Sequence, residues 1–291
     1  LSEVAPDLAK QTVADAVTIG VMSQPEDICL LRHDGSGKNA FKNPLSFRYL
    51  DDNFIESDAV KIGKTFMDYL KKTKDPRIHV YCSLKDGNTE FDKQFGLPNG
   101  YDSHTIADAP SGSFVGLENT SNFNINTILR LDAPTIFLMP SETKLLLAEA
   151  VLRNWTNGNA EVLYKEAITS SMKEQEIAYG TQGKITDEEI ETYLAQNLFS
   201  TANNTEKLQI IGEQYWVATF INGYESYANW RRTGYPKLIP TNYSGSMSPG
   251  VIPTRLPYPT DEYSINRANV DTANQQQGAD KVTTHIWWDI D

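Results

Sequence analysis

Aromatic and amide side chains gather in one stretch of the sequence that otherwise has the composition of loops. Aromatic faces pack against the apolar faces of sugar rings or against peptide side chains, while Asn and Asp supply the hydrogen bonds that fix orientation. The stretch from residue 81 to residue 124 therefore predicts a surface that binds a glycan or a peptide. The alternative is that its phenylalanines only pin long loops to the helices. The candidates for ligand contact are Tyr81, Phe95, Tyr101, Phe123 and Asn124.

Local signatures of an enzyme are missing from the sequence. Neither the nucleophile elbow GxSxG nor the zinc-peptidase motif HExxH occurs. Residues 34–38 resemble the end of a phosphate-binding loop, but the first glycine and the Ser or Thr after the lysine are lacking. Asp102, Asp108 and Glu118 could supply the carboxylate pair of a glycosidase, yet 38 acidic residues provide such candidates by chance. We therefore expect a protein that is not an enzyme.

Metal and cofactor sites are not predicted either. The four histidines, at positions 33, 79, 104 and 285, are too scattered to make a local metal site, although the fold could gather them. Oxygen ligands cluster at residues 51–53, but the glycine-bearing spacing of an EF-hand is absent, so a solvated turn is favoured over a calcium site. Cys29 and Cys82 have apolar neighbours and no CxxC partner, which favours two buried thiols over a disulfide. No cofactor is expected.

The bulk composition fits a globular protein with a sizeable core. With 291 residues, 40% of them hydrophobic, the chain can form one large domain or two modest ones. Its net charge of −12 repels a polyanion at long range, which disfavours nucleic acid as a partner. No run of about 18 apolar residues occurs, and the longest apolar stretches belong to amphipathic patterns.

The first region, residues 1–133, is expected to be rich in loops. Turn signals such as Asn-Gly and Asp-Gly recur between residues 20 and 133. A helix is predicted from Pro6 to about residue 17, a second from Ser57 as N-cap to residue 72, and a strand over residues 78–84. Residues 1–4 have the pattern of the last turn of a preceding helix, and the chain has no initiator Met. We therefore expect a fragment of a longer chain.

The second region, residues 134–235, carries the helical pattern. Helices are predicted over residues 142–154, with Ser141 as N-cap, then over 160–178 and over 187–196, and a long helix over 204–232 ends at Gly234. A capping box opens the third of them. Small and aromatic residues alternate at 160, 164 and 167, which is the spacing of the second helix of a tetratricopeptide unit. Aromatic residues recur at three- and four-residue steps between 215 and 230 and predict a stripe that faces the core.

The third region, residues 236–291, is expected to be an extended covering segment followed by a polar tail. Six of the fourteen prolines lie between Pro236 and Pro259, which forbids regular helix or central strand there. The chain closes on two adjacent tryptophans, Trp287 and Trp288, and such a pair usually docks on another surface.

Several short motifs resemble the SusD/RagB family, in particular its SusD-like lipoprotein branch. Each is weak alone, but their order along nearly the whole chain is specific. They are Asp75-Pro-Arg-Ile78 leading into Tyr81, Gly96-Leu-Pro-Asn-Gly100, Pro140-Ser-Glu142 with Leu147-Ala-Glu-Ala150, Tyr224-Glu225 with the run from Trp230 to Pro236, the run from Pro253 to Pro259 with Glu262, Asn266 and Asn269, and the closing Trp287-Trp-Asp289.

The resemblance implies a mainly α fold of tetratricopeptide-like helix pairs with a looped region packed on them. It implies a lipid-anchored protein on the outer face of the outer membrane, which partners a SusC-like TonB-dependent transporter and captures glycans or, in some members, peptides. It implies no catalysis. The chain resembles the C-terminal half or somewhat more of a member, so the lipid anchor and the first repeats are expected upstream. The alternatives are a helical-repeat scaffold that binds only a protein partner and, less favoured, a helical glycoside hydrolase.

Overall fold

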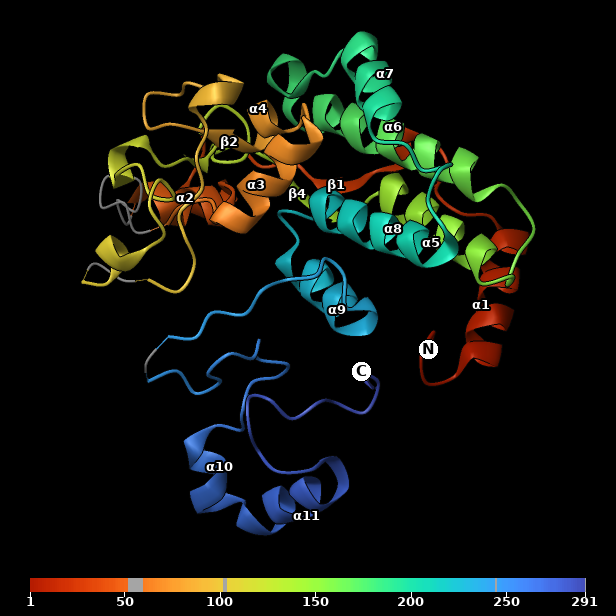
Figure 1. Cartoon of the computed structure of the whole chain (residues 1–291), viewed down its shortest axis with the longest axis vertical. Coiled ribbons are helices and arrows are strands. Elements are labelled where there is room, and N and C mark those ends of the chain that lie inside the picture. The colour runs from red at the N-terminus through yellow and green to blue at the C-terminus, as the bar shows by residue number, and fades with distance from the viewer. Residues whose placement is uncertain (52–59, 102–103, 244, 291) are drawn as a thin grey trace.

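The fold is mainly helical and consists of a helical body and a smaller C-terminal unit (Figure 1). The computed structural model describes residues 1–51, 60–101, 104–243 and 245–290. The helical body comprises everything up to α9 (Gly223–Thr233), and the C-terminal unit comprises residues 236–290 with α10 (Thr260–Ile265) and α11 (Arg267–Gln277). The predicted mainly α fold with helix pairs is confirmed, whereas the division after residues 133 and 235 stays a prediction.

Four helices form the repeat part of the body: α5 (Pro140–Leu152), α6 (Ala160–Tyr179), α7 (Asp187–Gln196) and α8 (Asn204–Ala218). Helix α5 packs against both α6 and α8. Ala160, Tyr164 and Ala167 are all buried on α6, so the alternation of small and aromatic residues marks the face that a neighbouring helix approaches closely. The predicted helices over 142–154, 160–178 and 187–196 are confirmed to within two residues at each end.

Local hydrogen bonds decide where these helices begin. The hydroxyl of Thr186 accepts from the backbone N–H of Glu189 at 3.3 Å, and the Glu189 carboxylate accepts from the N–H of Thr186 at 2.8 Å, which is the predicted capping box of α7. Ser141 is not the N-cap of α5, because Pro140 already occupies the first helical position. The Ser141 hydroxyl instead donates to the buried carboxylate of Glu174 at 2.6 Å.

The long helix predicted over 204–232 is wrong in one respect, since it is two helices, α8 and α9. The chain leaves helical geometry after Ala218, and the side chain of Asn222 then accepts from the N–H of Glu225 at 3.5 Å to start α9. Gly234 ends α9 with a φ of 66°, as predicted. Most aromatic residues of this stretch were predicted to face the core, and Tyr224, at 91% exposed, does not.

The loop-rich first region contains more helix than strand. Its elements are α1 (Pro6–Ile19), β1 (Cys29–Leu31), α2 (Pro44–Asp51), α3 (Lys64–Thr73), α4 (Ile78–Tyr81), β2 (Cys82–Ser83), β3 (Asn122–Phe123) and β4 (Thr135–Leu138). Short 3₁₀ turns lie at Pro25–Asp27, Asn39–Phe41, Phe91–Lys93, Ile106–Asp108 and Leu117–Asn119 in this region, and at Gly180–Gly183 after α6. Helix α1 confirms the predicted start at Pro6.

Two short antiparallel ladders tie this region together. Strand β1 pairs with β4, with Leu31 opposite Thr135, and β2 pairs with β3, with Cys82 opposite Phe123. Each ladder joins segments that lie far apart in the sequence. The second ladder fixes the loops of residues 84–121 at both of their ends, so these loops emerge from a rigid base.

The strand predicted over 78–84 is correct only at Cys82–Ser83, because Ile78–Tyr81 is helical. The carboxylate of Asp75 accepts from the backbone N–H of Arg77 at 2.9 Å and from its Nε at 2.9 Å, and this turn starts the short helix. Both side chains are fully buried. Arg77 also donates to Ser171 on α6 at 2.9 Å and to Gln214 on α8 at 2.7 Å, so the pair joins three parts of the body.

The helix predicted from Ser57 begins later, at Lys64. The backbone N–H of Lys64 donates to the carbonyl of Leu97 at 2.7 Å, and a Cβ on Gly96 would lie 2.4 Å from the Lys64 Cα. Residues 62–63 are thus extended alongside residues 96–97, which excludes helix at these two positions. The predicted N-cap Ser57 lies outside the described residues.

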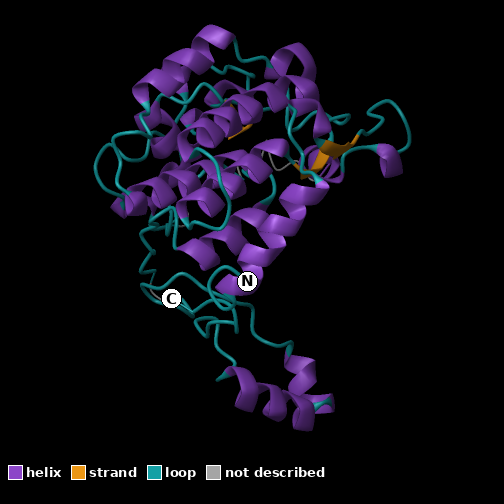
Figure 2. Cartoon of the chain, turned by 90° about the vertical axis from the view of Figure 1, so that its right-hand side faces the viewer, coloured by secondary structure: helices purple, strands orange, loops and turns teal. Residues whose placement is uncertain are grey.

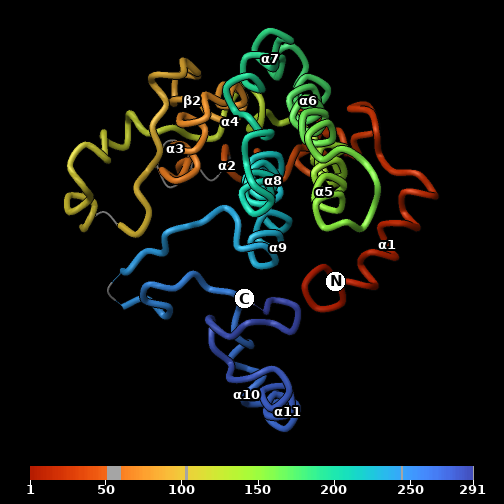
Figure 3. Tube along the Cα trace, turned by 45° about the vertical axis from the view of Figure 1, so that its right-hand side comes forward, coloured from red at the N-terminus to blue at the C-terminus, as the bar shows by residue number. Residues whose placement is uncertain are grey.

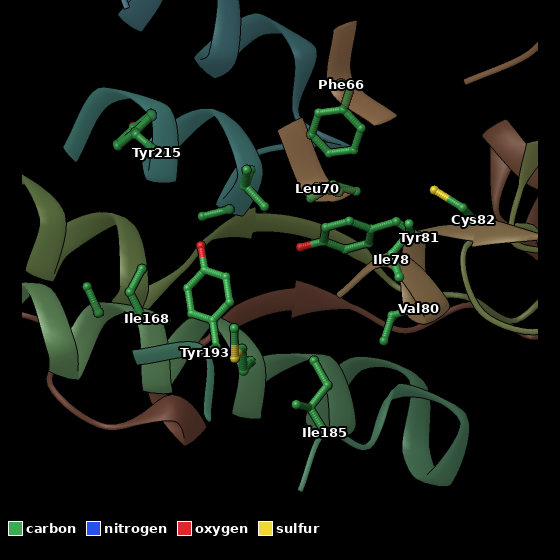
Figure 4. Packing of buried hydrophobic residues seen from close by; sticks show 14 of the residues in the cluster. Phe66, Leu70, Ile78, Val80, Tyr81, Cys82, Ile168, Ile185, Tyr193 and Tyr215 are labelled. Carbon is green, nitrogen blue, oxygen red and sulfur yellow. The ribbon is translucent and has the colours of Figure 1, made fainter. Parts of the chain in front are cut away.

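The core of the body is built from aromatic and aliphatic side chains of α3, α4, α6, α7 and α8 (Figure 4). In Figure 4, Phe66, Leu70 and Tyr81 lie on one side of this core, and Ile168, Tyr193 and Tyr215 on the other. Leu70, Ile78 and Ile168 are each at most 1% exposed. Helices α3 and α4 of the loop-rich region therefore share a core with the repeat helices.

The C-terminal unit lies beyond α9, at the end of the molecule away from α6 and α7 (Figures 2 and 3). Between Pro236 and Pro259 the described residues form no helix or strand, as the prolines predict. Helices α10 and α11 were not predicted, because their sequence is polar and lacks an apolar face. Within the described residues, no helix has the length and apolar character needed to cross a membrane.

The two cysteines differ in their environment. Cys82 is buried, and burial raises the pKa of its thiol. Cys29 is exposed at the start of β1, so the prediction of burial is wrong for this residue, since the two-stranded ladder leaves it uncovered. Both are free thiols.

Candidate ligand-binding site

Two of the five predicted contact residues, Tyr81 and Asn124, lie in the core. Tyr81 is 2% exposed, and burial raises the pKa of its hydroxyl. Asn124 is also 2% exposed, and its amide donates to the carbonyl of His79 at 2.7 Å while its oxygen accepts from the N–H of Asn126 at 2.8 Å. Both side chains thus hold the scaffold in place, which explains their presence without a ligand.

The other three predicted residues lie nearer the surface. Phe123 is half-buried, with its ring 5.5 Å from that of Phe220. Phe95 is 39% exposed and lies below the ammonium group of Lys71, 4.2 Å from the ring centre. Tyr101 is half-buried after the Asn-Gly turn. The structure does not bring the five residues around one cavity, and their contact with a ligand stays a prediction.

Tyr81 and Phe123 instead belong to a continuous cluster of aromatic rings that reaches the surface at Trp216. The rings of Tyr81 and Phe66 both contact that of Phe220, at centre distances of 5.0 and 4.3 Å. Phe66 meets the indole of Trp216 edge-on at 4.9 Å. Trp216 is only half-buried. The indole is therefore held rigidly from behind by the core while part of it remains accessible.

Phe66 and Trp216 form one wall of a cavity of about 520 Å³, here called the Trp216 cavity. The opposite wall comes from the extended part of the C-terminal unit. Neutral side chains line it throughout: Gly63, Thr65, Phe66, Asn99, Trp216, Leu238, Ile239, Pro240, Thr241, Ser246, Ser248, Val251, Ile252 and Pro253. Residues from three distant segments thus meet here, namely the start of α3 with the loop at Asn99, helix α8, and residues 238–253.

The loop that carries Asn99 is positioned by glycines of the Gly96–Gly100 motif. Gly96 packs on the backbone of Lys64, and Gly100 has a φ of 85°, a conformation that favours glycine. A Cβ on Gly100 would also lie 2.7 Å from the side chain of Thr241. The Asn99 turn can therefore approach residues 238–253 closely, and it closes one end of the cavity.

The polar groups of the cavity are uncharged and largely available. The side chain of Asn99 is exposed, and within the described residues neither it nor the indole N–H of Trp216 has a hydrogen-bond partner. Ser246 accepts from the N–H of Ser248 at 3.1 Å, which shapes the turn on the opposite wall. No titratable residue of the described chain lines the cavity. Such a site can stack a ring against Trp216 and hydrogen-bond its rim, and it offers no acid or base.

The described residues provide no metal site and no facing carboxylate pair in this cavity. No group of three or more His, Cys, Asp or Glu side chains could hold a metal ion within them. Asp108 and Glu118 are exposed and do not line the cavity. Asp102, Asp52 and Asn53, which belong to the glycosidase and calcium candidates, lie outside the described residues.

Sequence reasoning missed the main residues of the Trp216 cavity for identifiable reasons. Trp216 belongs to a helical aromatic stripe, and the period assigns it to packing, which it also does. Asn99 belongs to a motif that was noted for its glycines. Residues 238–253 read as a covering segment, and only the fold shows that they cover the site. The free amide of an Asn-Gly turn between aromatic residues was the one local signal.

Comparison with known proteins relates the chain to one family. The family model described as "Starch-binding associating with outer membrane", SusD-like, matches residues 1–259. No curated protein matches the sequence.

Among solved structures, a chitin-binding protein is 29% identical with a TM-score of 0.81, and the match covers 100% of this chain and 61% of that chain. A SusD-like protein of Bacteroidetes is 24% identical with a TM-score of 0.82, covering 100% and 66%. A chitin-binding SusD homologue from Flavobacterium johnsoniae is 24% identical with a TM-score of 0.76, covering 99% of this chain and 60% of that chain.

The chain thus spans about three fifths of the length of these structures. The fold of helix pairs with a looped region, and the family match over most of the sequence, agree. The protein belongs to the SusD-like family.

Proposed function

We propose that the protein is the nutrient-binding component of a glycan uptake system and that it holds the glycan in the Trp216 cavity. The observation that carries the proposal is a neutral cavity with a rigid, accessible indole on one wall and unpartnered amide and hydroxyl groups around it. The description of the family as starch-binding and the names of two chitin-binding structural relatives support a glycan as the ligand.

The chemistry of the Trp216 cavity suits a neutral sugar. Its volume of about 520 Å³ lies within the usual range of ligand sites. The indole of Trp216 offers an apolar face to the C–H side of a pyranose ring, and Asn99 and Thr241 can bind its hydroxyl groups. A hydrolase would need a general acid and a second carboxylate beside the ring, whereas the described lining holds neither. We therefore infer binding without catalysis.

The family match also leads us to propose an outer-membrane location and a transporter partner. Its description includes association with the outer membrane, which supports attachment to the cell-surface face through a lipid anchor upstream of residue 1. A SusC-like TonB-dependent transporter would then receive the glycan. Affinity purification of the full-length protein from its own outer membrane tests this part, because a transporter is expected in equal amount. Recovery of the protein alone would contradict it.

Calorimetric titration of the chain with maltohexaose and chitohexaose tests the ligand. The variant Asn99→Ala removes one exposed amide and is expected to weaken binding by roughly fivefold, as for one hydrogen bond. Asn157→Ala is the matched control, because Asn157 is also exposed and lies on the loop between α5 and α6, outside the cavity. Equal affinity of both variants and the unaltered protein would place the ligand elsewhere, and absence of binding to a wide glycan and peptide panel would exclude the function.

A further inference from the structure

The two adjacent tryptophans near the C-terminus have different environments. Trp288 is half-buried, and the guanidinium group of Arg231 on α9 lies 4.7 Å from its ring centre. Trp287 is 69% exposed. The indole of Trp288 therefore docks the C-terminal segment on the helical body. The indole of Trp287 stays exposed to water, which is unfavourable in free energy for so large an apolar side chain.

Trp287 lines a cavity of about 410 Å³ in the C-terminal unit, here called the Trp287 cavity. Its lining combines two aromatic rings, two amides and one imidazole: Tyr258, Ala273, Gln276, Gln277, His285 and Trp287. Neither amide has a hydrogen-bond partner within the described residues, so both are available to a ligand. All but Tyr258 lie beyond residue 259, where the family match ends.

The Trp287 cavity is built on a fixed frame. The carboxylate of Asp280 accepts from the backbone N–H of Tyr258 at 3.1 Å, from Arg255 at 2.9 Å and from the hydroxyl of Tyr263 at 2.6 Å. The guanidinium group of Arg255 lies 4.8 Å from the ring centre of Tyr258 and can cover only one of its faces. Asp280 thus holds Tyr258 in place by its backbone and by a stacked neighbour.

The imidazole of His285 is also oriented. Its Nδ1 lies 3.1 Å from the carboxylate of Asp289, whose side chain is 2% exposed. The other ring nitrogen, Nε2, has no partner within the described residues and can donate a hydrogen bond to a ligand or accept one from it. The backbone nearby is tied down as well, because Thr254 donates through its N–H to the carbonyl of Val282 at 2.8 Å.

We propose that the Trp287 cavity is a second saccharide-binding site, with Trp287 and Tyr258 as ring platforms and Gln276, Gln277 and His285 as hydrogen-bonding groups. The lining carries no acidic side chain, no Lys and no Arg, which favours a neutral ligand over a phosphate or a charged peptide. Exposed rings beside free amides are the chemistry that recognises neutral or N-acetylated sugar rings. The proposal rests on glycan binding as the function of the protein. Two sites on one protein would hold a long glycan more tightly than either alone.

Tryptophan indole N–H signals in NMR spectra give a local test with the whole chain. The sequence has five tryptophans, and the variants Trp287→Phe and Trp216→Phe assign two of the five signals. Titration with chitohexaose and with maltohexaose is expected to shift the Trp287 signal with at least one of them. Calorimetry on a background of Asn99→Ala should then show that Trp287→Ala weakens the remaining binding by about tenfold, as for an interface aromatic residue. Ile290→Ala is the matched control, since Ile290 is 61% exposed in the same segment and does not line the cavity.

The outcomes separate this site from the function itself. If the glycans shift the Trp216 signal alone and Trp287→Ala binds as tightly as the unaltered chain, the second site is wrong and the proposed function stands. A shift of the Trp287 signal that Ile290→Ala leaves intact supports the second site, whatever happens at Trp216. If neither signal moves and no heat is released with either glycan, both proposals are overturned. Exposure of Trp287 makes misfolding of its variants unexpected, and an unchanged circular dichroism spectrum verifies this.

Discussion

Each of the two units of the molecule is organised around a buried Asp–Arg pair. The two pairs differ in how far along the sequence their hydrogen-bond partners lie. In the helical body, Asp75 and Arg77 are fully buried, and Arg77 also bonds to Ser171 and Gln214, which lie 94 and 137 positions further along the chain. In the C-terminal unit, Asp280 and Arg255 are each 7% exposed, and Asp280 bonds only to residues within 25 positions. The first pair joins distant elements, whereas the second closes one local segment.

The polar contacts around each pair strengthen the contrast. Gln214, which accepts from Arg77, donates to the hydroxyls of Tyr69 and Tyr193 at 3.0 and 2.7 Å, so the network spans α3, α7 and α8. Burial acts to lower the pKa of Arg77, but the charge of Asp75, its hydrogen bond and further neighbours together outweigh burial and raise this pKa, so the guanidinium group stays charged. Within its described residues, the C-terminal unit has no comparable network. It meets the body along the Trp216 cavity and at α9, where Arg231 donates to the carbonyl of Thr254 at 3.0 Å. We infer that the body unfolds as one cooperative unit and that the C-terminal unit can open on its own.

The largest predicted effect comes from matched substitutions in the two pairs. Asp75→Asn leaves the guanidinium group of Arg77 buried without its counter-charge, and a broken buried pair typically costs about 3–5 kcal/mol of unfolding free energy. Asp280→Asn should change the global unfolding free energy by less than about 1 kcal/mol. Urea denaturation followed by circular dichroism measures the first quantity.

Hydrogen exchange distinguishes the two variants locally. Asp280→Asn is expected to speed exchange in residues 254–289 and to leave α5 to α8 unchanged, while Asp75→Asn should speed exchange across the body. If Asp280→Asn lowers the global stability as much as Asp75→Asn does, the two units fold as one and the comparison fails.

A second prediction concerns Glu142, a buried carboxylate of the body that has no cationic partner among the residues the structure describes. Burial raises the pKa of Glu142 to about 7, which the hydrogen bond from Tyr215 at 3.1 Å offsets in part. Its other oxygen is buried and has no partner within the described residues. Glu149 shows the opposite balance, because burial raises its pKa but Arg232 and Arg153 lower it further and hold it below its usual range.

The pH dependence of Glu142 has a definite sign. Between about pH 4.5 and pH 7 the folded state binds a proton that the unfolded state has released, so the unfolding free energy falls as the pH rises. The shift corresponds to a loss of about 3 kcal/mol, complete above pH 7. Glu142→Gln should remove this loss and be more stable than the unaltered chain at pH 8. Denaturation at pH 5 and pH 8 checks it, and parallel curves for both proteins would exclude a raised pKa.

The sequence predicts elements well where the information is local. The capping box of Thr186 and Glu189 and the start of α1 at Pro6 need only neighbouring residues, and both were correct. The break between α8 and α9 was missed because the aromatic period continues through it, while Asn222 caps a new helix. The strand predicted at residues 78–81 was wrong because Asp75 and Arg77 start a helix with the help of partners on α6 and α8.

The candidate site was less predictable than the fold, because it depends on contacts between segments that are distant in the sequence. The Trp216 cavity exists only because residues near 63, 99, 216 and 241 meet in space, and no spacing in the sequence records that. An aromatic residue in a loop can serve a ligand or the core, and pattern alone does not separate these roles. Tyr81 and Asn124 lie in the core, whereas Trp216, assigned to packing, reaches the surface.

The smallest predicted effect compares helix caps in the two units. Helices α6, α7 and α8 are capped by the side chains of Asn159, Thr186 and Asn203, whereas α10 and α11 have no side-chain cap. Thr186→Ala should lower the global unfolding free energy by about 1 kcal/mol, because it removes the cap from a helix that belongs to the cooperative body.

The matched change in the C-terminal unit is Asn266→Ala at the N-cap position of α11, where the Asn266 side chain bonds only to Glu262 and Asn269. We expect less than about 0.5 kcal/mol in the global unfolding free energy, since surface changes outside the cooperative unit rarely exceed that. Differential denaturation of the two variants measures both values. Equal losses would mean that α11 unfolds together with α7, and the Trp287 cavity would then share the rigidity of the body instead of depending on the local frame of Asp280.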